Sequence, residues 1–197
     1  PYIRNTSMPF NEYTWVAAHN AYLNDTSTEL ERGVRSLMWD LHPLTRKING
    51  SLTTDAYMCH YAPPSEEPDP YGACSDLGVT KRKFSTELNK VKNFLDKTEN
   101  RNAVVTIFLE DRIDTEYIQK AFNEVPNLGN YVFNINDYAN TNQWPTLQQI
   151  IDSNRRIIIF FERENGKYLF SGNNIELPND KIFIKQNIYD LGKAGFT

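Results

Sequence analysis

Short apolar runs that alternate with helical segments constrain the fold of this chain more than any other feature. The runs are rich in β-branched and aromatic residues, and their length is that of buried strands. They cover residues 14–18, 34–41, 56–59, 103–109, 131–133, 156–161 and 182–184. We interpret each run as a strand that is apolar on both faces.

The segments between these runs have helical spacing. Apolar residues recur three or four positions apart within residues 84–95, 118–122 and 147–151, which gives each segment one apolar stripe. Strands followed by amphipathic helices predict an α/β fold with a parallel sheet covered by helices. A closed (β/α) barrel of the TIM type and an open doubly wound sheet both satisfy this pattern.

Length limits the barrel. An eight-stranded barrel usually needs about 250 residues, and this chain has 197. We therefore expect one domain over residues 1–197, either a compact, distorted barrel or a fragment of a longer barrel that is incomplete at its carboxyl end.

Charge and hydropathy argue against a nucleic acid partner and against a transmembrane segment. The net charge is -4, the pI is near 5.4 and no lysine- or arginine-rich run is present, so we expect no nucleic acid partner. Apolar stretches fall far short of the roughly 20 residues that cross a bilayer. We expect a soluble chain without a transmembrane segment, from which any leader peptide has been removed.

The cysteines indicate an oxidising compartment. Cys59 and Cys74 flank a segment rich in proline and acidic residues, which can bring them together as a disulfide. Sequons for N-glycosylation begin at Asn5, Asn24 and Asn49. We predict a secreted glycoprotein, and two reduced thiols in a cytosolic protein are the alternative.

Polar side chains follow the apolar runs. Every histidine of the chain, His19, His42 and His60, ends such a run, and Glu110 ends another. Carboxyl ends of parallel strands meet on one face, where such folds place their active sites. One cavity is therefore expected to be lined by His19, Asn20, Asp40, His42, His60, Glu110 and Asp111.

Spacing alone leaves the chemistry open. Any one histidine at a strand end can simply be a hydrogen-bonded structural residue, and His42, which precedes Pro43, fits site and scaffold equally. A zinc hydrolase would use His19, His42 and His60 as ligands. A phosphodiesterase would use one imidazole as base, a second as acid and a cation to take up phosphate charge.

The ordered motifs resemble one family. Residues 13–163 are similar to the catalytic X domain of phosphatidylinositol-specific phospholipase C, and within it to the PLC-like phosphodiesterases. The resemblance rests on residues 18–22 (AHNAY), 33–40 (GVRSLMWD), 58–60 (MCH) with Cys74, 107–111 (IFLED), 144–147 (WPTL) and 154–161 (NRRIIIFF).

The resemblance implies a distorted TIM barrel that cleaves a phospholipid, with phosphatidylinositol as first candidate, or a related phosphodiester. The substrate's neighbouring hydroxyl attacks the phosphorus, and a cyclic phosphate forms. His19 matches the residue that helps to deprotonate that hydroxyl, and His60 matches the one that protonates the leaving oxygen. Peripheral contact with a membrane is a further expectation, with Tyr61 and Tyr71 as candidate contacts and plain surface tyrosines as the alternative.

The resemblance further implies a metal site. Asn20, Asp40 and Glu110 match positions that bind Ca²⁺, with Mg²⁺ as the alternative, and all three are oxygen donors. The family's phosphate-binding lysines have no clear counterpart, so we assign substrate binding to His42, Arg112 and Arg163.

Met38 and the expected incompleteness of the barrel keep a second function open. Met38 stands where calcium-dependent eukaryotic members carry a glutamate, which leaves the metal site one carboxylate short. Metal-independent bacterial members have arginine and lysine where this chain has Asp40 and Glu110, so the metal-using kind fits better. The alternative is a catalytically inactive PLC-like module that binds a ligand or partner.

Overall fold

The structure is a computed structural model that describes residues 5–59, 81–134 and 143–161. Its strands are β1 (Ala17–Ala18), β2 (Ser36–Ile48), β3 (Ser51–Met58), β4 (Arg82–Lys83), β5 (Val105–Asp111) and β6 (Ile157–Phe161). Its α-helices are α1 (Thr26–Glu31), α2 (Phe84–Asp96), α3 (Thr115–Asn123) and α4 (Leu147–Asp152). Short 3₁₀ helices cover Phe10–Glu12, Thr98–Asn100 and Leu128–Asn130.

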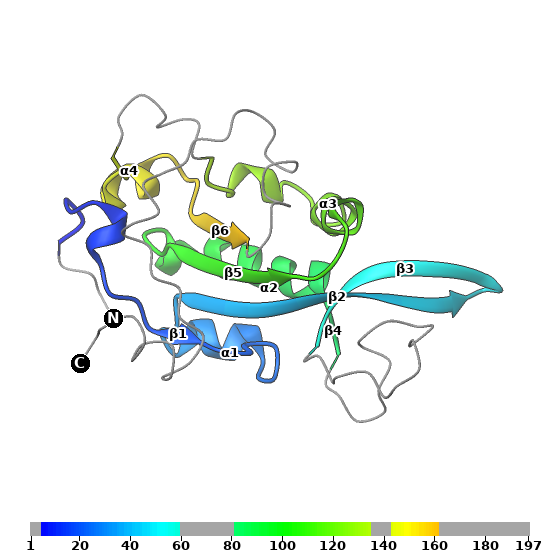
Figure 1. The fold of residues 1–197 in the computed structure, drawn as a ribbon. Coiled ribbons are helices and arrows are strands. Elements are labelled where there is room, and N and C mark those ends of the chain that lie inside the picture. Colours follow the sequence, from blue (N-terminus) through cyan, green and yellow to red (C-terminus); the bar gives the residue numbers. More distant parts are fainter. Residues whose placement is uncertain (1–4, 60–80, 135–142, 162–197) are drawn as a thin grey trace.

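These strands form one mixed sheet around β2 (Figure 1). β1 and β5 pair in parallel with the first half of β2, and β6 pairs in parallel with β5. β3 runs antiparallel to the second half of β2, and β4 runs antiparallel to the end of β3. The expected α/β class is confirmed, whereas the described residues form an open sheet and do not show a complete barrel.

The antiparallel hairpin of β2 and β3 corrects the expectation that all strands are parallel. Asn49 and Gly50 form its turn with φ of 49° and 87°, and two positive φ angles match the twist of a tight hairpin. β2 also passes through Pro43, because β5 ends beside Leu41 and the edge beyond it needs no N–H from β2.

Two smaller expectations are also corrected. The run at 14–18 is a strand only at Ala17–Ala18. Residues 131–133 make a single parallel bridge, between Val132 and Ile157, because a 3₁₀ turn ends directly before them. The run at 182–184 lies outside the described residues.

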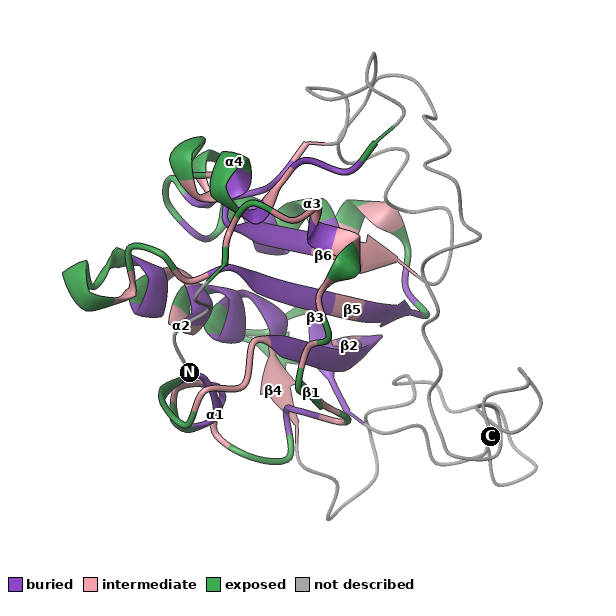
Figure 2. Ribbon diagram, turned by 90° about the vertical axis from the view of Figure 1, so that its left-hand side faces the viewer, coloured by how far each residue is buried: buried purple, intermediate pink, exposed green. Residues whose placement is uncertain are grey.

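The main core lies between the sheet and its helices (Figure 2). Leu37, Trp39 and Leu41 alternate along β2 and are fully buried. The ring of Trp39 packs edge to face on the ring of Phe84, the first residue of α2, with 6.0 Å between the ring centroids.

The predicted helices at 84–95, 118–122 and 147–151 are confirmed as α2, α3 and α4. In the described ranges no helix is long and apolar enough to span a bilayer.

Candidate active site

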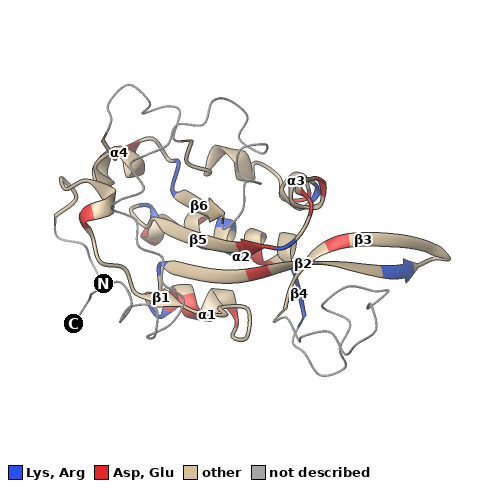
Figure 3. Ribbon diagram, viewed as in Figure 1, with Lys and Arg blue, Asp and Glu red and all other residues tan. Residues whose placement is uncertain are grey.

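Two carboxylates lie side by side on the sheet face opposite the main core. Asp40 of β2 is the register partner of Glu110 of β5, near the carboxyl ends of both strands. Side chains alternate between the two faces of a strand, so both point away from the face that carries Trp39. Figure 3 shows the two acidic segments next to one another. Both residues are mostly buried.

His19 and Asn20 reach the same corner from β1. Ala18 is the register partner of Leu37, and the N–H of Ala21 donates to the Met38 carbonyl at 3.0 Å. His19 and Asn20, which lie between Ala18 and Ala21, therefore form a turn beside β2. Asn20 adopts a left-handed conformation with φ of 50°, which asparagine tolerates better than most residues. His19 is exposed to solvent.

The side-chain oxygen of Asn20 is an unsatisfied acceptor. Its Oδ1 is buried and has no hydrogen-bond partner among the described residues. A buried acceptor without a donor costs free energy comparable to a lost hydrogen bond. Such an atom needs a donor or a cation that the described residues do not supply, and a water or a bound ion would meet that need.

Tyr22 fixes the carboxylate of Asp40. Its hydroxyl donates to Asp40 Oδ2 at 3.2 Å, and its side chain is fully buried. Burial, then the charge of Asp40 and finally that of Glu110 raise the pKa of Tyr22 above its ordinary value. The hydroxyl therefore stays protonated and keeps donating.

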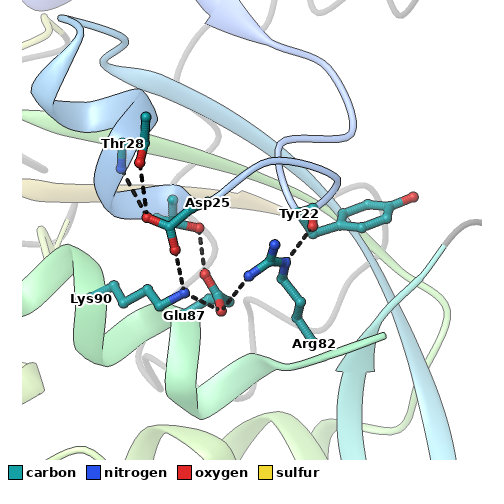
Figure 4. A network of polar contacts seen from close by, with 7 residues as sticks. Tyr22, Asp25, Thr28, Arg82, Glu87 and Lys90 are labelled. Carbon is teal, nitrogen blue, oxygen red and sulfur yellow. Dashed lines mark hydrogen bonds and ion pairs between the residues drawn. The ribbon is translucent and has the colours of Figure 1, made fainter. Parts of the chain in front are cut away.

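Arg82 and Glu87 hold the backbone of Tyr22 in place (Figure 4). Arg82 Nε donates to the Tyr22 carbonyl at 2.6 Å, and Arg82 Nη1 lies 3.8 Å from Glu87 Oε1. Glu87 is almost fully buried and also accepts from Thr26 Oγ1 at 2.6 Å. The buried carboxylate of α2 thus ties the loop after His19 to α1 and β4.

Lys90 extends this network to the start of α1. Its Nζ donates to Glu87 Oε1 at 2.9 Å and to Asp25 Oδ1 at 2.8 Å. Asp25 caps α1 by accepting from the Thr28 N–H at 3.0 Å. Both ends of the segment 22–26 are therefore fixed, which sets the position of Tyr22 relative to Asp40.

Sequence reasoning missed Tyr22, and its partner Arg82 lies 60 positions further along the chain. The only local signal is that Tyr22 belongs to the same run as His19 and Asn20. The structure also corrects the expectation for Asp111. Asp111 is the register partner of Leu41, and this puts it on the helix-covered face, where it is fully buried.

Arg112 and His42 flank the carboxylate pair. Arg112 Nη2 lies 3.4 Å from Glu110 Oε2, and its side chain is 40% exposed. His42 was expected at a strand end, but it lies inside β2 and is 3% exposed. It shares the face of Asp40 because it is two positions further along the strand.

Five predicted residues, His60, Tyr61, Tyr71, Cys74 and Arg163, lie outside the described residues. β3 nevertheless ends close to the site, because the Cys59 N–H donates to the Asp40 carbonyl at 3.2 Å. Cys59 is fully buried, and the described part of the chain contains no free cysteine.

The donor set fits a hard cation better than zinc. Within residues 5–59, 81–134 and 143–161, no group of three or more His, Cys, Asp or Glu side chains gathers to hold a metal. Two carboxylates, Asp40 and Glu110, are register partners, and Asn20 lies in the turn next to them, between Ala18 and the Ala21 that bonds to the Met38 carbonyl. Oxygen donors are the ligands that Ca²⁺ and Mg²⁺ prefer, and the unsatisfied Oδ1 of Asn20 supports this interpretation.

Comparisons with known proteins identify the family of the chain. The PI-PLC X family model matches residues 15–171. A PI-PLC X domain-containing protein of Arabidopsis thaliana is 25% identical over 173 residues, which are 78% of this chain and 36% of the relative. PI-PLC X domain-containing protein 1 of Arthroderma benhamiae is 26% identical over 163 residues, 78% of this chain and 47% of the relative.

A solved structure shares the fold. It is a calcium-dependent phosphoinositol-specific phospholipase C from a Gram-negative bacterium, Pseudomonas sp., and superposes with a TM-score of 0.53 at 18% identity. The match covers 81% of this chain and 60% of the bacterial chain. This chain thus spans less than two thirds of the length of each of these proteins.

The network around Tyr22 predicts an acid-sensitive contribution to stability. Hydrogen bonds from Lys90 and then from the Thr28 N–H lower the pKa of Asp25 from 3.8 to about 2. A lowered pKa means that the ionised carboxylate contributes fully above pH 4 and loses its contribution as the pH falls toward 2. Asp25→Asn keeps the cap acceptor and removes the charge.

We expect Asp25→Asn to lower the free energy of unfolding by about 0.5 kcal/mol at pH 7, since the side chain is partly exposed. The difference from wild type should vanish as the pH approaches 2. Urea unfolding across this pH range measures it, with Asp152→Asn on the exposed end of α4 as control. A difference that stays constant down to pH 2 would contradict the assignment.

Proposed function

Because the chain belongs to the PI-PLC X family, we propose that it is a phosphoric diester hydrolase or lyase acting on a phospholipid, with phosphatidylinositol as first substrate. The observation that carries the proposal is the pairing of Asp40 with Glu110, with the unsatisfied Oδ1 of Asn20 in the turn that bonds to the neighbouring part of β2. His19 directly precedes that asparagine and is open to solvent.

In the proposed reaction the substrate supplies its own nucleophile. His19 takes the proton of the hydroxyl next to the phosphate, and that oxygen forms a new bond to phosphorus. The bond from phosphorus to the leaving oxygen breaks, and His60 gives that oxygen a proton. The products are a cyclic phosphate and a neutral alcohol. The role of His60 rests on the family resemblance alone.

Asn20, Asp40 and Glu110 would hold Ca²⁺, or alternatively Mg²⁺. When bound, such a cation neutralises charge that builds up on the phosphate in the transition state. Tyr22 supports the proposal because its hydroxyl fixes one oxygen of Asp40. The calcium dependence of the bacterial enzyme with the same fold also supports it.

Arg112 is the proposed phosphate contact. Its guanidinium is partly exposed and lies beside Glu110, so a small movement would bring it to an anionic group. Arg163 is proposed for the same role from the sequence. His42 is nearly inaccessible to solvent, and we assign it to the wall of the substrate site.

A second function is favoured by one observation. Met38 lies on the face of Asp40, two positions earlier in β2, and leaves the cation with one carboxylate fewer than calcium-dependent eukaryotic members have. A site weakened in this way would suit a module that binds a phosphodiester or a partner without cleaving it.

We also propose that the protein is secreted and that Cys59 pairs with Cys74. A thiol-reactive label should modify neither cysteine in the native or unfolded protein unless a reductant is added first. Peptide mapping without reductant should recover both cysteines in one linked fragment. Labelling of both cysteines in the oxidised, unfolded protein would contradict the pairing.

Turnover tests the main proposal. Purified protein should release inositol phosphate from phosphatidylinositol with Ca²⁺ and lose this activity with a chelator. His19→Ala and His60→Ala should each reduce kcat at least about a hundredfold, and Asp40→Asn should abolish the response to Ca²⁺. Asp114→Asn, at an exposed position just before α3, should behave as wild type.

The outcomes separate the functions. Turnover that ignores the chelator would contradict the cation. A folded wild type that binds the lipid headgroup without turnover under any condition would contradict the enzyme and favour the binding module.

Tyr22→Phe tests how the cation site is held. The variant keeps the ring but removes the hydroxyl that donates to Asp40. We expect the Ca²⁺ dissociation constant, measured by calorimetry, to rise about tenfold, as is typical when a partner of a metal ligand is lost. Tyr131→Phe is the matched control, because it removes a hydroxyl bonded to a remote carboxylate, that of Asp96. Equal affinities for wild type and Tyr22→Phe would contradict this role.

A further inference from the structure

The tip of the β2–β3 hairpin, residues 46–53, projects past the carboxyl ends of β5 and β6 (Figure 1). Two aliphatic side chains are exposed there, with Ile48 at 43% and Leu52 at 72% of their full accessibility. Among the described residues the only other large apolar side chains exposed to this degree are Val16 and Leu23. The tip therefore exposes two large apolar side chains away from the core.

Cations accompany these aliphatic side chains. Arg46 and Lys47 are exposed, and the sequence has no acidic residue from 46 to 54. Arg46 leans towards the hairpin base, where its Nη2 lies 3.8 Å from Asp55 Oδ2, so Lys47 is the cation closer to the turn. Lys47 is the register partner of Leu52, and Ile48 is the partner of Ser51. By alternation each face of the tip carries one aliphatic and one basic side chain. The tip is thus locally basic in a chain whose net charge is -4.

The hairpin is held rigidly from its base. Thr45 and Thr54 share a hydrogen bond between their hydroxyls at 2.8 Å. Lys120 of α3 binds the Asp55 carboxylate at 2.6 Å and donates to the Thr54 carbonyl at 3.0 Å. The tip therefore cannot fold back easily to bury Ile48 and Leu52, and it presents them outward.

We propose that this tip inserts into the headgroup layer of an anionic phospholipid membrane. Aliphatic side chains on opposite faces do not form the single flat patch that a protein partner would cover. They suit entry into a soft apolar medium, and Lys47 stays level with the phosphates. The choice of a lipid surface rests on the proposed function, whereas the exposure and charge of the tip do not.

The tip acts as a tether and takes no part in the reaction. Eight register pairs, from Leu41 with Met58 to Ile48 with Ser51, separate the site at Asp40 from the turn. Losing the tip should therefore weaken binding to vesicles and raise KM for vesicle-borne substrate. It should leave kcat unchanged, and turnover of a water-soluble phosphodiester should not change.

Vesicle sedimentation tests this directly. Vesicles of phosphatidylcholine alone are compared with vesicles that also contain phosphatidylserine, using wild type, the double variant Ile48→Ser with Leu52→Ser, and Lys47→Glu. We expect wild type to prefer the anionic vesicles, the double variant to bind them about tenfold more weakly, and Lys47→Glu to lose the anionic preference. Val16→Ser is the matched control, because Val16 is 71% exposed but precedes β1 at the opposite end of the parallel strands.

Binding is measured apart from turnover, so the two proposals fail separately. A wild type that sediments with anionic vesicles through this tip supports the inference even if it cleaves no lipid. Equal binding by wild type and the double variant would overturn it. A glycan found fully occupying Asn49 of the secreted protein would also overturn it, because a bulky polar group at the turn would keep the tip out of the membrane.

Discussion

The parallel register between β2 and β5 is the constraint on which the site depends. It sets Asp40 opposite Glu110, and a slip of one residue would turn Asp40 toward the helices. Two carboxylates held together and mostly out of water repel one another. The hydroxyl of Tyr22 and the guanidinium of Arg112 relieve part of this repulsion. A cation bound between the carboxylates would relieve more, so the register that defines the fold also favours metal binding.

Periodicity predicted the helices α2, α3 and α4 and the strands at the centre of the sheet, because these elements bury a regular stripe or both faces. It failed for β2, which changes partners midway. Residues 36–41 pair with β5 and are mostly apolar, whereas residues 42–48 pair with β3 alone and include His42, Thr45, Arg46 and Lys47. The pattern therefore ended the strand where its pairing with β5 ends. Helix α1 was missed because six residues are too few to show a stripe.

The rule that parallel strands end at a common face predicted that Asp40 and Glu110 are neighbours, and the register of β2 and β5 agrees with it. The turn after β1 also lies beside β2, through the bond from Ala21 to Met38. The end of β3 also lies beside Asp40, but the rule does not explain this. β3 is antiparallel and returns beside Asp40 through the hairpin. The rule could not find Tyr22, whose position depends on Arg82 and α2, residues far away in sequence. Contacts of this kind arise from tertiary packing and leave no local pattern.

Met38 affects the strength of the proposed cation site in two opposing ways. Its register partner is Phe108, whose ring stacks on Phe160 at 5.0 Å, so the row next to the carboxylate pair is apolar. An apolar neighbour lowers the local dielectric and strengthens the attraction between a cation and Asp40. A glutamate in place of Met38 would add a ligand, but it would also add a third negative charge that the protein must hold when no cation is bound. Compared with a glutamate, Met38 thus lowers the affinity of the proposed site for a cation and also lowers the charge repulsion when the site is empty. The enzyme needs the cation to bind, whereas the binding module does not.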